Sequence, residues 1–370
     1  MKKTIFYSIT VLFLILVNFL IGEVFTRLFH KGNILFPENG QVIDPYGKNP
    51  YIVSFKPFIL SHLPKAEYTQ SRSGFSVSYK INSLGFREKE IEPKSNKKRI
   101  AVVGDSLVEG HGVEYHETFV YHLKNKFQED DIEIYNLGIQ GTSLLPFSAN
   151  LKRYFQFQPD IILISIFEND WLDDRKYELS YFTLPYIENP SIYFVNKNIF
   201  LNNSKFVQFL NPTLHTYLYP YSDVEKIIKD NLKSHKHLNK FEVLLSIKKH
   251  ETIPAELTAL NFSLSSKYVD YIIDECSKRG IKVYFLNLTN NIYSPESSKE
   301  KLVSIEKSNE LFEEYLLKKQ IPYLSIKDIV LKYYEKETNK LLYIEGDGHP
   351  TREAHFMYFN HIYPWLKSLL

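Results

Sequence analysis

Four short motifs in the sequence carry residue types suited to attack on an ester carbonyl. They are Gly104-Asp105-Ser106-Leu107, Asn136-Leu137-Gly138-Ile139-Gln140-Gly141, Phe167-Glu168-Asn169-Asp170 and Asp347-Gly348-His349-Pro350. A serine hydroxyl becomes an effective nucleophile only when a nearby base takes its proton. Ser106 is therefore the candidate nucleophile and His349 the candidate base.

A third group must fix the tautomer of such a histidine. Asp347 stands two residues before His349, and in extended or turn backbone both side chains can project to the same side. Gly348 between them allows the backbone to bend. Asp347 is therefore the expected orienting acid, and Glu345 is the alternative.

The reaction also needs hydrogen-bond donors that stabilise the developing oxyanion. We expect these to be the backbone N–H groups of Ser106 and Gly141 and the side-chain amide of Asn169. Each motif alone has a structural alternative as a turn or a helix cap. Their joint presence, each after a strand-like run or near the C-terminus, favours one catalytic site.

The elements around the motifs predict an α/β fold. Apolar runs indicate parallel strands at residues 99–103, 132–137, 161–167, 282–288 and 322–326, and the first three end at the serine, glycine and asparagine motifs. Helical patterns occur at residues 118–127, 146–155, 264–279, 300–319 and 351–370. Five strands in flavodoxin-like order, in a three-layer α/β/α sandwich, would bring those strand ends together.

In this order the motifs resemble those of the SGNH (GDSL) hydrolase family of esterases, deacetylases and acyl transferases. The resemblance spans roughly residues 78–370 and includes Asn82-Ser83-Leu84-Gly85-Phe86-Arg87, which is typical of membrane-associated bacterial members. It implies the same roles for Ser106, Gly141, Asn169 and His349. Two departures stand out: Phe167 and Glu168 replace the family's Gly-x before Asn-Asp, and the spacing from Asp347 to His349 is one residue shorter than usual.

The N-terminus predicts a location. Lys2 and Lys3 precede residues 5–22, an apolar stretch of about the length that spans a membrane. No small-x-small cleavage site follows it. We expect residues 1–32 to be an uncleaved single-pass anchor in the cell membrane, with the catalytic domain on the extracytoplasmic side. A cleaved signal peptide and a buried core helix are the alternatives.

The rest of the chain divides into a lead-in, residues 33–96, that packs on the catalytic domain, and a hydrolase domain, residues 97–370. The interval 171–261 breaks the strand and helix alternation and is too long for a plain loop, so we expect an insertion after the third strand. Its aromatic residues could stack on sugar rings or cover an acyl chain; a self-packed cap is the alternative. Asp105 and Trp171 are candidate substrate contacts.

Composition narrows the class of function. The 370 residues include 45 basic and 43 acidic side chains, and this balance gives no basic field for nucleic acid. The single cysteine excludes an internal disulfide. No ligand spacing typical of a metal site occurs, so we expect neither metal nor cofactor.

We therefore expect a serine-dependent esterase, deacylase or acyl transferase that acts on O-acyl esters of an envelope glycan or lipid. Hydrolysis and transfer share one acyl-enzyme and differ in whether water or a hydroxyl group accepts the acyl group. The alternative is a non-catalytic glycan-binding or envelope-assembly protein that retains the scaffold.

Overall fold

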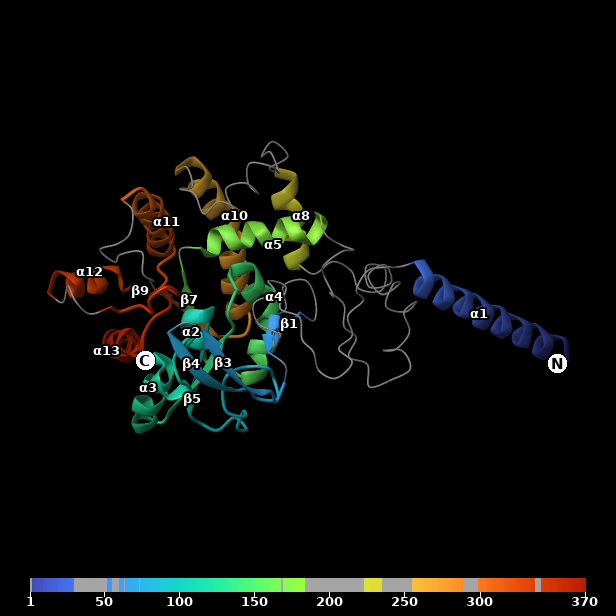
Figure 1. The fold of residues 1–370 in the computed structure, drawn as a ribbon, viewed down its shortest axis with the longest axis horizontal. Helices are drawn as coiled ribbons and strands as arrows, with labels where there is room; N and C mark the ends of the chain where they lie inside the picture. Colours follow the sequence, from blue (N-terminus) through green and yellow to red (C-terminus); the bar gives the residue numbers. More distant parts are fainter. Residues whose placement is uncertain are drawn as a thin grey trace. The chain divides into compact units, whose positions relative to one another are not determined.

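The computed structural model describes residues 2–29, 52–54, 60–62, 64–72, 74–167, 169–183, 223–234, 255–288, 299–336 and 341–370 (Figure 1). The strands are β1 Ile52–Ser54, β2 Leu60–His62, β3 Glu67–Arg72, β4 Phe75–Lys80, β5 Lys98–Gly104, β6 Ile132–Gly138, β7 Ile161–Ile166, β8 Lys282–Asn287 and β9 Tyr323–Ser325. The α-helices are α1 Lys2–Phe29, α2 Ser106–Glu109, α3 Phe119–Phe127, α4 Leu144–Tyr154, α5 Asp170–Thr183, α8 Asp223–Ser234, α10 Ala255–Ser277, α11 Lys299–Lys318, α12 Lys327–Lys336 and α13 Arg352–Ser368.

The central element is a five-stranded sheet in the order β6-β5-β7-β8-β9. All of its neighbouring strands pair in parallel. In chain order this is the arrangement second, first, third, fourth, fifth, so the predicted flavodoxin-like sheet is confirmed. Because β5 lies between β6 and β7, the loop that carries Ser106 has the glycine loop on one side and the asparagine loop on the other.

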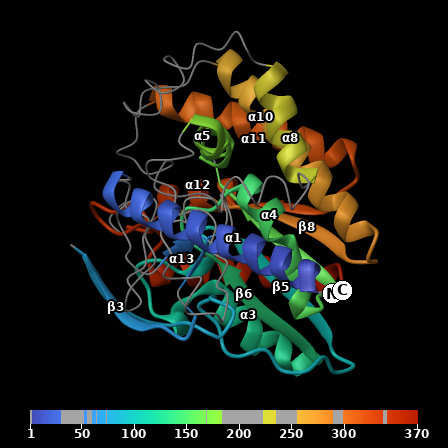
Figure 2. The same ribbon diagram turned by 90° about the vertical axis from the view of Figure 1, so that its right-hand side faces the viewer.

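Helices cover both faces of the sheet, which is why β7 is buried along its whole length and β5 is buried from Arg99 onward. Apolar side chains of α3, α12 and α13 form one core cluster with alternate strand residues such as Ile100 and Val102. Helix α4 packs on the other face beside α10, and α10 contacts α11 (Figure 2). The predicted three-layer arrangement is therefore present.

The chain divides into two compact units, residues 1–57 with 180–222 and residues 58–179 with 223–370. Helix α1 belongs to the first unit, and the large sheet belongs to the second. Among the helices in the described ranges, none has both the length and the apolar character needed to cross a membrane. The expected transmembrane segment is therefore not confirmed.

Several elements differ from the sequence-based expectation. Strands β3 and β4 form an antiparallel hairpin within the lead-in, where only Val77, Tyr79 and Ile81 alternate as buried apolar positions. Helix α12 was not expected, and α10 begins at Ala255 inside the predicted insertion. Helices α5 and α8 also fall in that interval, whereas residues 184–222 and 235–254 lie outside the described residues.

Candidate active site

Ser106 is the first residue of α2, directly beyond the end of β5. The carboxylate of Asp105 caps this short helix by accepting a hydrogen bond from the Leu107 backbone N–H (2.9 Å). Helix α2 packs closely on β6, because a Cβ atom at Gly138 would lie only 2.3 Å from the Glu109 nitrogen. The glycine at the end of β6 thus fixes where the candidate nucleophile stands.

His349 reaches Ser106 from the other end of the chain. Its Nε2 atom lies 2.9 Å from the Ser106 Oγ atom, and its Nδ1 atom makes a hydrogen bond with the Asp347 carboxylate. Glu345 is exposed. The structure therefore brings Ser106, His349 and Asp347 into one chain of contacts and leaves Glu345 on the surface, despite the shortened spacing.

The second carboxylate oxygen of Asp347 faces two further residues that the sequence analysis did not identify. Arg72 Nη1 lies 3.3 Å from Asp347 Oδ2, and His111 Nε2 lies 3.7 Å from the same oxygen. Burial alone would raise the pKa of Asp347, but interactions with His111 and His349 hold that pKa well below its ordinary range. Asp347 is thus ionised at neutral pH.

His111, Asp347 and His349 each place one potential metal-ligand atom within 4.8 Å of the others. Sequence spacing did not indicate this cluster. Hydrogen bonding already engages both nitrogens of His349, and the guanidinium of Arg72 lies on the Asp347 carboxylate. The donor set therefore fits a proton-transfer chain better than it fits a cation.

The loop after β6 carries Gly141, a candidate oxyanion donor with a positive φ of 72°. The Gln140 backbone N–H donates to Glu109 Oε2 (2.6 Å), and the Ile139 N–H donates to the Gly104 carbonyl (3.0 Å). The Tyr177 hydroxyl donates to the Gly141 carbonyl. The backbone around Gly141 is thus tied to α2, to the end of β5 and to α5.

Asn169 stands on the loop after β7, immediately before α5. Its side-chain amide donates to Asp173 Oδ2 (2.6 Å), and its carbonyl accepts the N–H groups of Leu172 and Asp173. One amide hydrogen of Asn169 is left for another acceptor. The residue is exposed on the same strand-end edge as Ser106.

Two buried carboxyl groups lie close to this loop. Burial, which outweighs a hydrogen bond from Leu107, raises the pKa of Asp105 to about 6. Burial and the nearby Asp105 raise the pKa of Asp170 well above its ordinary value. A raised pKa favours the neutral form of Asp170, and the neutral form limits the negative charge near this loop.

Asp105 and Trp171, the two expected substrate contacts, are both buried. Asp105 is 6% exposed and serves as the cap of α2. Trp171 is 3% exposed, and its ring packs against Phe262 and Phe312 with centroids 5.3 Å away in each case. The first turn of α5 thus places the Trp171 ring in the helical layer, and a substrate contact by either residue stays a prediction.

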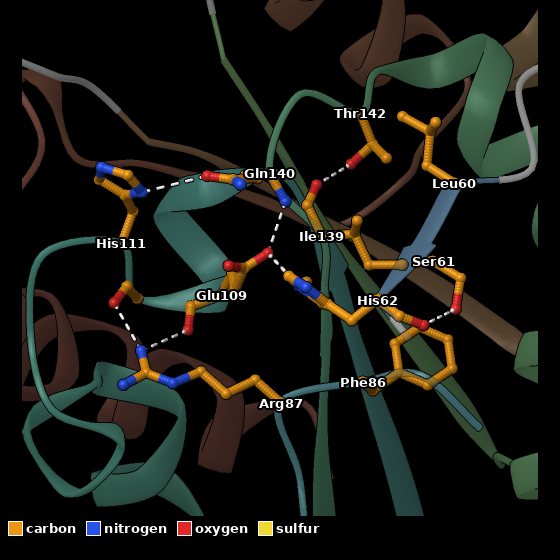
Figure 3. A network of polar contacts seen from close by, with 12 residues as sticks. Leu60, Ser61, His62, Phe86, Arg87, Glu109, His111, Ile139, Gln140 and Thr142 are labelled. Carbon is orange, nitrogen blue, oxygen red and sulfur yellow. Dashed lines mark hydrogen bonds and ion pairs between the residues drawn. The ribbon is translucent and has the colours of Figure 1, made fainter. Parts of the chain in front are cut away.

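Arg87 of the lead-in holds the loop that follows Ser106. Its buried guanidinium donates to the carbonyls of Gly110 (2.7 Å), Val113 (3.0 Å) and Ser78 (2.8 Å), and lies 3.4 Å from the Glu109 carbonyl. Figure 3 shows Arg87 beneath Glu109, with Gln140 and His62 on the Glu109 carboxylate. The family-like lead-in motif was a signal for this arginine; nothing in the spacing indicated His62, Arg72 or His111.

No family model matches the sequence, and no curated protein matches it. Solved structures do match. An acetylxylan esterase from Geobacillus stearothermophilus, solved as a catalytic mutant, is 10% identical over 74% of this chain and 96% of its own, with a TM-score of 0.41. An esterase from Pseudoalteromonas is 13% identical over 74% of this chain and 98% of its own, with a TM-score of 0.36.

A GDSL-like lipase from Bacteroides thetaiotaomicron is 14% identical over 75% of this chain and 92% of its own, with a TM-score of 0.36. Similarity at this level says nothing about substrate. The solved structures that match thus include esterases and lipases of the GDSL type, the family that the four sequence motifs resemble.

Proposed function

We propose that this protein hydrolyses carboxylic esters through an acyl-enzyme formed on Ser106. The observation that carries the proposal is the distance of 2.9 Å between His349 Nε2 and Ser106 Oγ, with Asp347 on the other nitrogen of the same ring. That separation is within the range in which a general base takes a hydroxyl proton.

In the first half of the reaction, Ser106 Oγ attacks the ester carbonyl carbon and its proton passes to His349 Nε2. The carbonyl oxygen becomes an oxyanion, for which the N–H groups of Ser106 and Gly141 and the amide of Asn169 are the proposed donors. The C–O bond to the alcohol then breaks, and His349 returns the proton to the departing oxygen. In the second half, water attacks the acyl carbon while His349 takes its proton; the bond between that carbon and Ser106 Oγ then breaks, His349 returns the proton to Oγ, and the acid leaves.

Substrate and acceptor are the finer part of the proposal. An O-acyl group on an envelope glycan or lipid is the substrate class we favour, on the strength of the N-terminal sequence and the aromatic residues of the insertion. Acyl transfer to a hydroxyl would use the same acyl-enzyme, and product analysis with and without a sugar acceptor separates the two reactions. The alternative is a non-catalytic binding protein, whose binding activity would not change when Ser106 is replaced.

The location remains part of the proposal. Lys2 and Lys3 precede the apolar residues 5–22, and every apolar side chain of residues 11–16 on α1 is more than half exposed. Apolar surface of this kind calls for a nonpolar partner, and we favour a bilayer. Protease added to spheroplasts should digest the catalytic domain. Protection of that domain would contradict its extracytoplasmic position, and a soluble protein that starts after about residue 25 would contradict an uncleaved anchor.

Turnover of a chromogenic acyl ester tests the activity. Ser106→Ala and His349→Ala should each lower kcat by about 10⁴ to 10⁶, because the members of such a unit act together. Thr142→Ser offers a matched control, since it keeps a hydroxyl group that donates to the backbone carbonyls of Gly104 and Ile139. Activity close to wild type in Ser106→Ala would overturn the proposal.

A further inference from the structure

A second histidine lies against the candidate dyad and is not explained by the reaction as proposed. His111 is 1% exposed, and its ring centroid lies 4.1 Å from that of His349, with 39° between the ring planes. We propose that His111 is a positioning residue that fixes Asp347 and the Gly141 loop relative to one another. This inference rests on the proposed function of Ser106.

One side of His111 faces the orienting acid. Its Nε2 atom is buried, has no hydrogen-bond partner among the residues that the structure describes, and lies 3.7 Å from Asp347 Oδ2. Asp347 uses its other oxygen for His349. An N–H on His111 Nε2 would therefore restrain rotation of the carboxylate, and this rotation decides whether Oδ1 stays on His349.

The other side of His111 faces the loop of the candidate oxyanion donor. His111 Nδ1 lies 3.1 Å from the side chain of Gln140, and Gln140 directly precedes Gly141. Figure 3 shows this contact on one side of the network, with the Gln140 backbone turned toward Glu109. His111 thus touches both parts of the candidate machinery that Ser106 needs.

The two contacts together select a protonation state. Burial lowers the pKa of His111 below its ordinary value, so the neutral ring is favoured. A neutral ring carries one N–H, and placing it on Nε2 makes the contact with Asp347 attractive. The His111 Nδ1 atom then accepts a hydrogen bond from the Gln140 amide. This requires the Gln140 side-chain amide to be flipped, so that its nitrogen rather than its oxygen faces Nδ1; the hydrogen-bond network decides between the two orientations. Neutrality also spares His349 a cationic neighbour when it takes the serine proton.

The Gln140 loop has a rigid support on its far side. Glu109 Oε2, which accepts the Gln140 backbone N–H, also contacts His62 Nε2 at 3.0 Å, and both of these side chains are fully buried. The Tyr68 hydroxyl lies 3.2 Å from His62 Nδ1. Movement of Gln140 away from His111 would break contacts in this buried chain, so the loop offers a fixed point to which Asp347 can be held.

Substitutions of His111 separate its two contacts. His111→Ala should lower kcat by about 10²-fold with KM changed by less than about twofold, because a misplacement of roughly 1 Å costs that much. His111→Gln can keep an amide near the Nε2 position and His111→Asn can keep one near Nδ1. We expect each to recover part of the loss. Gln140→Met should cost about tenfold alone and nothing further in the His111→Ala background, since residues in one network are not additive.

A readout independent of turnover keeps this test separate from that of the proposed function. Nitrogen-15 NMR of the imidazoles should show His349 with its proton on Nδ1 in the wild type and as a tautomer mixture in His111→Ala. His122→Ala is the control; it removes a half-buried histidine that packs on Phe356 and Phe359, away from this network. The inference would be overturned if folded His111→Ala kept both the wild-type His349 tautomer and the wild-type kcat. If the wild type showed the expected tautomers but did not hydrolyse esters, only the proposed function would be contradicted.

Discussion

The two loops on either side of Ser106 are held in place in different ways. The loop after β6 is fixed by residues far away in the sequence, including Glu109 on the Gln140 N–H and Gly104 on the Ile139 N–H. The loop after β7 is held by its neighbours, since Asn169 bonds to Leu172 and Asp173, which lie three and four positions further along the chain in α5. The proposed donor of the first loop is therefore a backbone N–H fixed by distant residues, whereas the proposed donor of the second is a side chain whose position follows α5.

This difference shows which part of the site tolerates change. When two segments far apart in the sequence are hydrogen-bonded, neither moves easily, because the other segment is held by its own packing. Contacts within one helical turn move with the helix. Asp347 belongs with the first kind, since Arg72 of β3 and His111 lie on its outer oxygen.

The largest expected effect concerns this acid. Asp347→Asn should lower kcat by up to about 10⁴, because an amide can donate to His349 Nδ1 and favours the tautomer that cannot take the serine proton. Glu345→Gln is the matched control on the same turn and should leave kcat within about twofold. If instead Glu345→Gln abolishes activity and Asp347→Asn spares it, the long-range contacts on Asp347 have no part in catalysis.

The locally held loop should respond less strongly. Asn169→Ala should lower kcat by about 10² to 10³ through loss of one oxyanion donor, with little change in melting temperature. Kinetics and thermal melts on one preparation give both quantities. Asp173→Asn keeps Asn169 and changes only its partner, so it should cost less. A large drop in melting temperature at unchanged kcat would make Asn169 a turn residue.

The smallest expected effect is on stability. Asp174 on α5 is fully buried, and burial raises its pKa to about 6 although Ser143 and Leu145 donate to it. A raised carboxyl pKa favours the folded state at low pH, and that contribution is lost as the pH rises through about 6. Asp174→Asn should therefore stabilise the protein by up to about 3 kcal/mol at pH 7.5 and hardly at all near pH 4.

Urea unfolding of both proteins at the two pH values measures this difference. If Asp174→Asn is equally or less stable than the wild type at pH 7.5, the carboxylate is satisfied in the folded state and the polar contacts of α5 contribute stability. Such a result would mean that the loop after β7, like the loop after β6, is stabilised by contacts with distant residues.

Local sequence patterns predicted the sheet well, because buried parallel strands are continuous apolar runs. Residues 99–103, 132–137 and 161–167 were expected as strands, and β5, β6 and β7 agree with them to within one residue at each end. The motifs at their ends also indicated which residues the structure would bring together. Ser106 and His349 are 243 positions apart and in contact.

The polar support of the site could not be predicted in the same way. Arg72, His62 and His111 act through contacts between segments whose distance in sequence carries no pattern. Trp171 was expected to contact substrate because it is the first residue of the predicted insertion, but the sequence did not show how α5 is rotated about its axis. The rotation of the helix about its axis decides whether the Trp171 ring is buried in the core or faces the candidate site.

The central claim is that Ser106 is an activated nucleophile, and a fluorophosphonate probe tests it most directly because only an activated serine reacts. Peptide mass spectrometry should find one phosphonyl adduct on the wild-type protein, on the peptide that contains Ser106, and none on Ser106→Ala. Absence of an adduct from folded wild-type protein, or an adduct that persists on Ser106→Ala, would contradict the account.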